Sequence, residues 1–278
     1  MPKTKFALAA LAAIMGLGLL TAAPAVADDQ DVCADESGDV AIAACTRAIK
    51  SNRYGGHALA ALYNNRCSEY LDKEDFDLAI SDCRAAIKSD KAYAMPHQNL
   101  GLIYYKQSNY DRAIEETTAA IKLDPKYAKA FGTRASSYSL KGDHDRAIAD
   151  YNAAIRLDPK SPISLANRCD ELAILRQYRA ALKDCDESLR IRPNHQNTTR
   201  HRAIVYLALG DVDSASRDFA NLIEMDPNDP IALYGRGITK LRKGDAAGGR
   251  EDMTEAKSRR ETVPEAFSSY GVTAEAKR

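Results

Sequence analysis

Several kinds of residue are scarce or missing in this chain of 278 residues, and each absence excludes some classes of protein or partner. Trp is absent and Phe occurs only 5 times, so Tyr, with 14 copies, supplies most of the aromatic mass. The chain has no excess charge, because 39 basic side chains balance 39 acidic ones. We therefore expect neither a nucleic acid nor an anionic membrane surface as a partner, since both require a basic excess.

Motifs for catalysis and for metal binding are also missing. The sequence contains no G-x-S-x-G, P-loop, G-x-G-x-x-G or H-E-x-x-H motif. None of its six cysteines forms a C-x-x-C pair, the close spacing that zinc sites favour. The acidic residues fall on solvated helix faces and in turns rather than in an apolar pocket. We predict that the chain is not an enzyme and that it uses no metal or cofactor.

The first 27 residues follow the pattern of a secretory signal. Lys3 and Lys5 precede fifteen apolar residues, and the small triplet Ala-Val-Ala ends at Ala27. Fifteen apolar residues are fewer than the roughly 20 that a membrane-spanning helix needs. We expect cleavage after Ala27 and export, most simply to a bacterial periplasm, with secretion as the alternative. The mature chain, 28–278, then has 37 basic against 39 acidic side chains and places its cysteines in an oxidising compartment.

A period of 34 residues organises most of the remaining chain. In each period a small residue lies twelve positions before a proline, and an aromatic residue or Leu lies earlier. Such a unit predicts two amphipathic helices joined by a turn, as at 141–145, with the proline ending the second helix. The prolines that set the period are Pro125, Pro159, Pro193 and Pro227.

This pattern resembles the tetratricopeptide repeat in its period, small residues, tyrosines and terminal prolines. The resemblance implies an all-α, right-handed superhelical solenoid of antiparallel helix pairs. A half-repeat at 28–59 is expected to precede the array, and a capping helix with a tail at 263–278 to follow it. The repeats are expected at 60–93, 94–127, 128–161, 162–195 and 196–229, followed by a degenerate repeat at 230–262.

The cysteines obey the same repeat. With each terminal proline numbered 32, Cys67 and Cys169 fall at position 8, and Cys83 and Cys185 fall at position 24. Facing Cα atoms of two packed helices approach to about 4–5 Å, within reach of a disulfide. A metal site and a reactive thiol are the alternatives. Six cysteines allow 15 pairings, of which this register favours Cys33–Cys45, Cys67–Cys83 and Cys169–Cys185.

Arginine and aspartate recur in the same register. Five repeats carry Arg at position 7 and Asp at position 23, and the one repeat with Leu100 at position 7 has Glu116 at position 23. A planar guanidinium suits a carboxylate on the facing helix, so we predict structural ion pairs rather than a basic ladder for an anionic ligand. The predicted pairs are Arg66–Asp82, Arg134–Asp150, Arg168–Asp184, Arg202–Asp218 and Arg236–Asp252.

The resemblance also implies a binding surface, because the first helices of similar proteins line a concave groove. Amides there can donate and accept hydrogen bonds to an extended peptide, while aromatic and basic residues supply anchors. An ordinary solvated helix face is the alternative interpretation. The candidate groove residues are Asn64, Asn65, Gln98, Asn99, Tyr105, Lys129, Asn167, Arg200, His201 and Tyr234.

These observations together predict a periplasmic scaffold or adaptor that binds a protein or peptide segment in its groove. The alternative is a non-catalytic accessory subunit of an enzyme that assembles the cell envelope or a polysaccharide. A carrier of small molecules or nucleotides would need a closed apolar pocket, and the sequence shows none. The mature chain is predicted to contain no membrane span.

Overall fold

The computed structural model describes residues 28–274, and these residues form fifteen α-helices that pack in sequence order. No strand occurs within this range. The predicted all-α solenoid of helix pairs is confirmed. The predicted signal, 1–27, lies outside the described residues.

The helices alternate between first and second members of a pair. The first helices are α1 (Asp29–Asp35), α3 (Gly56–Asp72), α5 (Ala94–Lys106), α7 (Ala128–Leu140), α9 (Pro162–Ile174), α11 (Gln196–Leu209) and α13 (Pro230–Arg242). The second helices are α2 (Gly38–Lys50), α4 (Phe76–Ser89), α6 (Tyr110–Leu123), α8 (His144–Leu157), α10 (Tyr178–Ile191), α12 (Val212–Met225) and α14 (Ala246–Arg259). A short last helix, α15 (Val263–Ser269), follows α14.

Local sequence explains where these helices begin and end. Pro162 and Pro230 occupy the first turn of α9 and α13, where a missing N–H costs nothing. Several second helices begin after a residue whose side chain accepts a hydrogen bond from a backbone N–H of the first turn. These capping residues are Asn109, Asp143, Asp211 and Asp245.

The turn inside each of the six pairs from α3–α4 to α13–α14 has one residue in the left-handed region, always at position 15 of the repeat. Only glycine adopts this backbone conformation without steric cost. Glycine supplies it in three repeats, and a residue with a side chain supplies it in the other three. The six residues are Glu74, Ser108, Gly142, Arg176, Gly210 and Gly244.

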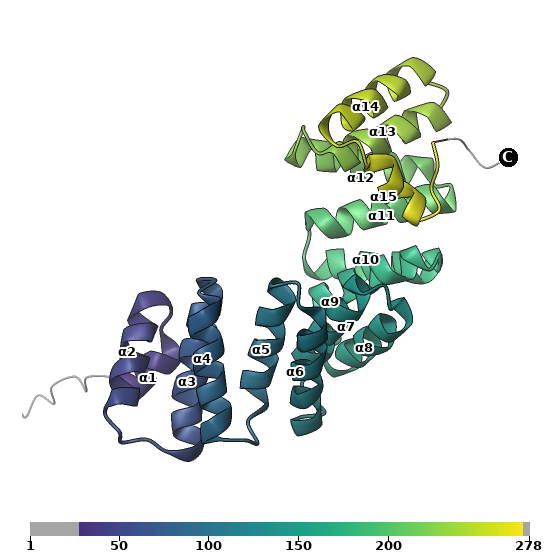
Figure 1. The fold of residues 1–278 in the computed structure, drawn as a ribbon. Helices are drawn as coiled ribbons and strands as arrows, with labels where there is room; N and C mark the ends of the chain where they lie inside the picture. Colours follow the sequence, from purple (N-terminus) through teal and green to yellow (C-terminus); the bar gives the residue numbers. More distant parts are fainter. Residues whose placement is uncertain (1–27, 275–278) are drawn as a thin grey trace, which may run out of the picture.

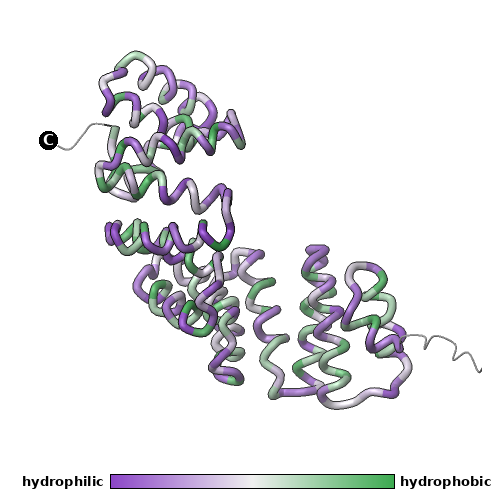
Figure 2. Tube along the Cα trace, turned by 180° about the vertical axis from the view of Figure 1, so that it is seen from behind, coloured by the Kyte–Doolittle hydropathy of each residue, from purple (hydrophilic) through white to green (hydrophobic). Residues whose placement is uncertain are grey.

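Small buried residues set the close approach of the helices. The alanines at position 20 are completely buried, as in Ala113, Ala147, Ala181 and Ala215. Hydrophobic residues recur along every helix (Figure 2). Each first helix contacts the next first helix along the array, whereas each second helix contacts mainly its two flanking first helices. The first helices therefore form a continuous layer, which we call the inner face.

The array bends as it progresses from α1 to α14 (Figure 1). The N-terminal unit pairs the seven-residue α1 with α2, and Cys33 and Cys45 join the two helices. At the other end, the chain turns back after α14, and α15 packs against α13 instead of continuing the stack (Figure 1).

Candidate functional site

The candidate groove residues lie on the inner face, but three of them, Asn64, Gln98 and Asn99, form hydrogen bonds between repeats. Asn64 is only 2% exposed, and its Oδ1 accepts a hydrogen bond of 3.1 Å from Nδ2 of Asn99 in the next repeat. Gln98 is 4% exposed and donates a hydrogen bond of 2.8 Å from Nε2 to Oγ1 of Thr133. The expectation that Asn64 and Gln98 line an open groove is wrong, because both are buried and bond neighbouring first helices, although Oε1 of Gln98 has no hydrogen-bond partner within residues 28–274.

Four other candidates remain open on the N-terminal half of the inner face. Asn65 and Asn167 are half-buried, and Lys129 is exposed. Asn65 donates to the carbonyl of Cys33 at 3.5 Å, and the Asn167 side chain lies near the hydroxyl of the buried Tyr151. The fourth, Tyr105, is half-buried with its ring 6.1 Å from that of Tyr110, and burial raises its pKa.

The remaining candidates lie where the C-terminal segment returns to the inner face. Tyr234 is only 5% exposed and lies 5.1 Å from the ring of Phe267 in α15. It therefore lines a covered surface rather than the open groove that we expected. Arg200 donates to Asp229 at 2.8 Å, and Nε2 of His201 lies 3.6 Å from Oδ1 of Asp170. Both are half-buried.

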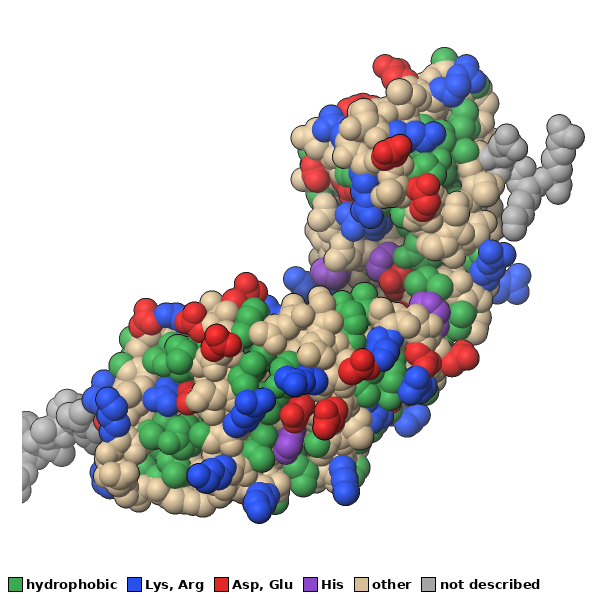
Figure 3. Space-filling view, in the orientation of Figure 1, with side chains coloured by type: hydrophobic (Ala, Val, Ile, Leu, Met, Phe, Trp, Pro, Cys, Tyr) green, Lys and Arg blue, Asp and Glu red, His purple; other side chains and the backbone are tan. Residues whose placement is uncertain are grey.

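The space-filling view shows a hollow between the N-terminal and C-terminal arms of the array (Figure 3). Histidine side chains border this hollow (Figure 3). His144, at the start of α8, contacts the buried carboxylate of Glu171 at 2.7 Å, and Ser139 donates to the same carboxylate. Both oxygens of Glu171 are thus engaged, so this buried acid is not a free acid–base group.

The structure joins the six cysteines in the predicted pairs. The Cα–Cα distances are 4.8 Å for Cys33–Cys45 and 5.5 Å for both Cys67–Cys83 and Cys169–Cys185. The latter two occupy positions 8 and 24, where other repeats pack glycine or alanine against a larger side chain. A Cβ added at Gly101 would lie 2.5 Å from Cγ2 of Thr117, for example. The disulfide therefore takes the place of a tight contact between helices.

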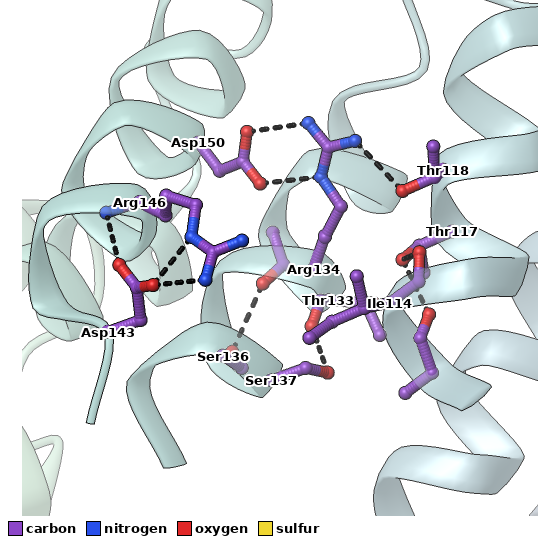
Figure 4. A network of polar contacts seen from close by, with 12 residues as sticks. Ile114, Thr117, Thr118, Thr133, Arg134, Ser136, Ser137, Asp143, Arg146 and Asp150 are labelled. Carbon is purple, nitrogen blue, oxygen red and sulfur yellow. Dashed lines mark hydrogen bonds and ion pairs between the residues drawn. The ribbon is translucent and has the colours of Figure 1, made fainter. Parts of the chain in front are cut away.

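Each predicted Arg–Asp pair is a two-point ion pair across its helix pair. Nε and Nη2 of the arginine donate to the two carboxylate oxygens over distances of 2.6–2.8 Å. Figure 4 shows this geometry for Arg134 and Asp150. The bonds to Asp150 raise the pKa of Arg134 against the opposing effect of burial. These arginines are occupied structurally and do not form a free basic ladder.

A tetratricopeptide repeat family model matches residues 65–128 and 99–162, and a second such model matches 173–234. Together the matches span more than half of the chain. The chain belongs to the tetratricopeptide repeat (TPR) family. None of the curated proteins matches the sequence.

Solved TPR structures share the fold at low identity. YrrB, described as a TPR protein with an unusual peptide-binding site, is 21% identical, with a TM-score of 0.58 over 68% of this chain and 98% of YrrB. PilW, a widely conserved type IV pilus biogenesis factor, is 17% identical, with a TM-score of 0.63 over 76% of this chain and 97% of PilW. A TPR protein from Parabacteroides merdae is 23% identical, with a TM-score of 0.59 over 76% and 87%. At these identities the likeness concerns the fold.

One contact of the TPR arginines was missed by sequence reasoning. In four of the five arginines the third nitrogen, Nη1, donates to the preceding unit, so that Arg66, Arg134, Arg168 and Arg202 also connect two units. In three repeats the acceptor lies sixteen residues earlier, at position 25, and this spacing could have revealed it. These acceptors are Thr118 for Arg134, Asn152 for Arg168 and Asp186 for Arg202, at 2.7–3.1 Å.

The TPR unit that lacks this arginine makes substitute contacts. Nδ1 of His97 lies 2.7 Å from Glu116, which stands at position 23 in place of Asp. Arg84 occupies position 25 of the preceding unit and donates to the hydroxyl of Tyr104 at 3.1 Å. Where Leu100 replaces the arginine of other repeats, the residues at the two partner positions, 23 and 25, therefore bond other side chains.

Within residues 28–274, the His, Cys, Asp and Glu side chains form no cluster of three arranged to hold a metal ion. Over the same range, no helix is both long and apolar enough to cross a membrane.

Proposed function

We propose that this TPR protein is an exported, non-catalytic scaffold of the periplasm that binds an extended segment of a partner protein. The open half of the inner face, on α3, α5, α7 and α9, is the proposed binding surface. One observation carries this proposal. Position 6 places a half-buried polar side chain on each of these four successive helices, namely Asn65, Asn99, Thr133 and Asn167. Asn99 and Thr133 also bond Asn64 and Gln98, so Asn65 and Asn167 are the more accessible members of this row.

The spacing of these side chains suits an extended chain. Packed helices lie roughly 8–10 Å apart, and an extended chain advances about 3.3 Å per residue. Each repeat would therefore meet about every third residue of a bound segment. An amide side chain can bond both the N–H and the C=O of that segment, so recognition would depend on the main chain more than on sequence. The exposed Lys129 would add a preference for an acidic neighbour.

Two features support the periplasmic location. The sequence of residues 1–27 has the charge and apolar pattern of a secretory signal. The described residues contain three disulfides and no free cysteine, which is typical of proteins in oxidising compartments. Among similar structures, the peptide-binding site named for YrrB supports a binding role, and the role named for PilW is consistent with an envelope setting.

The test is capture of partners from a periplasmic extract by three forms of the mature chain. The inner-face variant carries Asn65→Ala, Lys129→Ala and Asn167→Ala, and it keeps Asn64 and Gln98 because their amides join repeats. The matched outer variant carries three alanines at exposed positions near the ends of second helices, Lys88→Ala, Lys122→Ala and Arg156→Ala.

We expect the native and outer forms to retain a protein that the inner-face variant loses. Equal capture by all three forms would contradict the proposed surface. One obligate partner that copurifies in equal amounts, rather than a protein that exchanges, would favour the alternative function of an accessory subunit in envelope or polysaccharide assembly. Fractionation of cells, with thiol labelling before and after reduction, tests the location separately.

A further inference from the structure

The chain from Val263 to Ala274, which we call the C-terminal segment, folds back onto the inner face. A cap that only shields the last repeat would need to cover α13 and α14. The C-terminal segment instead reaches α13, α11 and α9 in turn, since its residues contact Tyr234, His201 and Asp170. In Figure 1, α15 crosses in front of α11 and α13. Helix α15 therefore lies at the C-terminal end of the inner face, whereas the proposed binding surface of α3 to α9 lies toward the N-terminal end.

Apolar side chains anchor the C-terminal segment at three points. Phe267 is 1% exposed and packs against the rings of Tyr234 at 5.1 Å and Phe219 at 6.2 Å. Val272 is buried as well. Tyr270 contacts two separate core clusters, one around α11 to α14 and one around α9 and α10. Buried aromatic anchors of this kind dominate the binding energy of many protein interfaces.

Side chains of the repeats bind the main chain between these anchors. The hydroxyl of Tyr178 donates to the carbonyl of Tyr270 at 2.7 Å, and Nη2 of Arg242 donates to the carbonyl of Thr273 at 3.2 Å. The hydroxyl of Tyr270 in turn donates to Asp170 at 2.5 Å. Main-chain bonds combined with side-chain anchors are the means by which grooves recognise extended peptides.

Gly271 fits this surface closely. Its φ of +70° lies in the left-handed region, and an added Cβ would lie 2.9 Å from the Tyr178 hydroxyl and 3.2 Å from Nε of Arg176. A residue with a side chain at this point would be strained by its backbone and would crowd the groove. We therefore expect substitution of Gly271 to weaken docking of the C-terminal segment without changing any repeat.

The C-terminal segment leaves part of the groove unsatisfied. Nε of Arg200, Nδ1 of His201 and Nε of Arg242 are buried and have no hydrogen-bond partner in residues 28–274. A buried polar atom without a partner weakens the state that contains it. Burial also lowers the pKa of Arg242, with no carboxylate acting against it, unlike the arginines of the Arg–Asp pairs. A ligand that supplied further acceptors here would fit this part of the groove better.

We propose that the inner face of α9, α11 and α13 is a second peptide-binding site, which accepts an extended, tyrosine-anchored and acidic segment of a partner protein. The C-terminal segment occupies this site in the free protein and is displaced when such a segment binds. The two sites share only α9, which contributes Asn167 to the first and Asp170 to the second, so either proposal can fail while the other stands.

The test uses the full chain and a synthetic peptide with the sequence of residues 262–274, acetylated and amidated. Hydrogen exchange followed by mass spectrometry reports on the chain's own 263–274. Excess peptide should speed exchange in this segment while α9, α11 and α13 stay protected, because the peptide replaces the segment on them. Unchanged exchange at saturating peptide would overturn the proposal.

Gly271→Ala in the full chain tests whether the C-terminal segment is a displaceable ligand or a fixed cap. We expect the peptide to bind this variant about tenfold more tightly, since the apparent affinity rises with the fraction of sites that are open. The same substitution in the peptide should weaken binding to either chain. Ser268→Ala, an exposed change in α15, is the matched control and should leave the affinity unaltered. A Gly271→Ala chain that keeps its helical circular dichroism but binds no peptide would overturn the proposal.

A peptide with Thr273→Asp tests the chemistry of the partner. It should bind more tightly than the unchanged peptide because its carboxylate can pair with Arg242, and this gain should disappear in high salt. Weaker binding of the acidic peptide would overturn the acidic character assigned to the partner. If Gly271→Ala makes the chain dimerise, as measured by light scattering, and the peptide cannot dissociate the dimer, the occupant is a second copy and the partner assignment is wrong.

Discussion

The hydroxyl of Tyr270 donates a hydrogen bond of 2.5 Å to Oδ1 of Asp170, which lies 100 residues earlier in the chain. Repeats of a solenoid normally contact only their neighbours, so its stability is close to a sum of local terms. This bond joins the end of the chain to α9, across the two repeats that separate them. The last three repeats should therefore unfold more cooperatively than the rest of the array.

Tyr270→Phe tests this coupling. The substitution keeps the ring but removes the donor to a carboxylate, so the free energy of unfolding should fall by about 2 kcal/mol. Urea unfolding followed by circular dichroism measures the change. Tyr110→Phe is the control, because no hydrogen bond of the Tyr110 hydroxyl occurs in the described chain, and it should change stability by less than about 0.5 kcal/mol. Equal effects of the two substitutions would contradict the role of the bond.

The repeat register predicted far more than the individual surface residues did. Period, helix pairing and the family follow from positions that recur, since every repeat solves the same packing problem. The Arg–Asp geometry is an example, because Leu100 changes together with Glu116 at the partner position. Such internal covariation is visible in a single sequence.

Two features could not be predicted in this way. Asn64 and Gln98 have the polarity of surface residues, yet the packing of consecutive repeats buries both amides against the next helix. The burial of Tyr234 depends on the C-terminal segment, which occurs once and has no equivalent position in another repeat. Contacts that depend on the superhelix or on a unique segment leave no period in the sequence.

The Arg134–Asp150 pair should contribute strongly to stability because both side chains are largely buried. Asp150→Ala leaves Arg134 buried without its carboxylate, so we expect a loss of about 3 kcal/mol. Figure 4 shows a natural control nearby, the pair Arg146–Asp143, whose arginine is mostly exposed. Arg146→Ala should cost less than about 1 kcal/mol. Chemical unfolding of both variants provides the comparison, and similar losses would refute the argument.

The contact between positions 8 and 24 should accept a new disulfide in the repeat at 94–127. Gly101 and Thr117 occupy the positions that Cys67 and Cys83 fill one repeat earlier. Gly101→Cys with Thr117→Cys should form a bond that stabilises the chain by about 3 kcal/mol in the chain-entropy model. Non-reducing peptide mapping detects the bond, and unfolding with and without reductant measures its effect. Gly101→Cys alone should destabilise the protein, because its Cβ would lie 2.5 Å from Thr117.

Ser108 is a site at which glycine should stabilise the protein. Its φ of +59° lies in the left-handed region, where an L-residue with a side chain is strained. Ser108→Gly should raise the free energy of unfolding by about 0.5–1 kcal/mol after the greater flexibility of unfolded glycine is counted. The reverse change in the next repeat, Gly142→Ala, should lower it by about 1 kcal/mol. The idea fails if both substitutions shift stability in the same direction.

Asp252 should make the last repeat sensitive to acid. Burial acts to raise its pKa, but hydrogen bonds from Arg236 and Lys240 prevail and hold the pKa below its ordinary value. The folded state therefore favours the ionised form of Asp252. The contribution of Asp252 to stability is complete above its pKa in the unfolded chain, about 4, and is lost as the pH falls through its lower pKa in the folded chain. Asp252→Asn should therefore be less stable than the native chain at pH 7, and the gap should narrow below about pH 4. Urea unfolding across this pH range measures the gap. Glu251→Gln is the control, because Glu251 is exposed and forms no ion pair within residues 28–274, and it should leave the pH dependence of stability unchanged. If the stability difference between Asp252→Asn and the native chain stays constant with pH, then Arg236 and Lys240 do not favour the ionised form of Asp252.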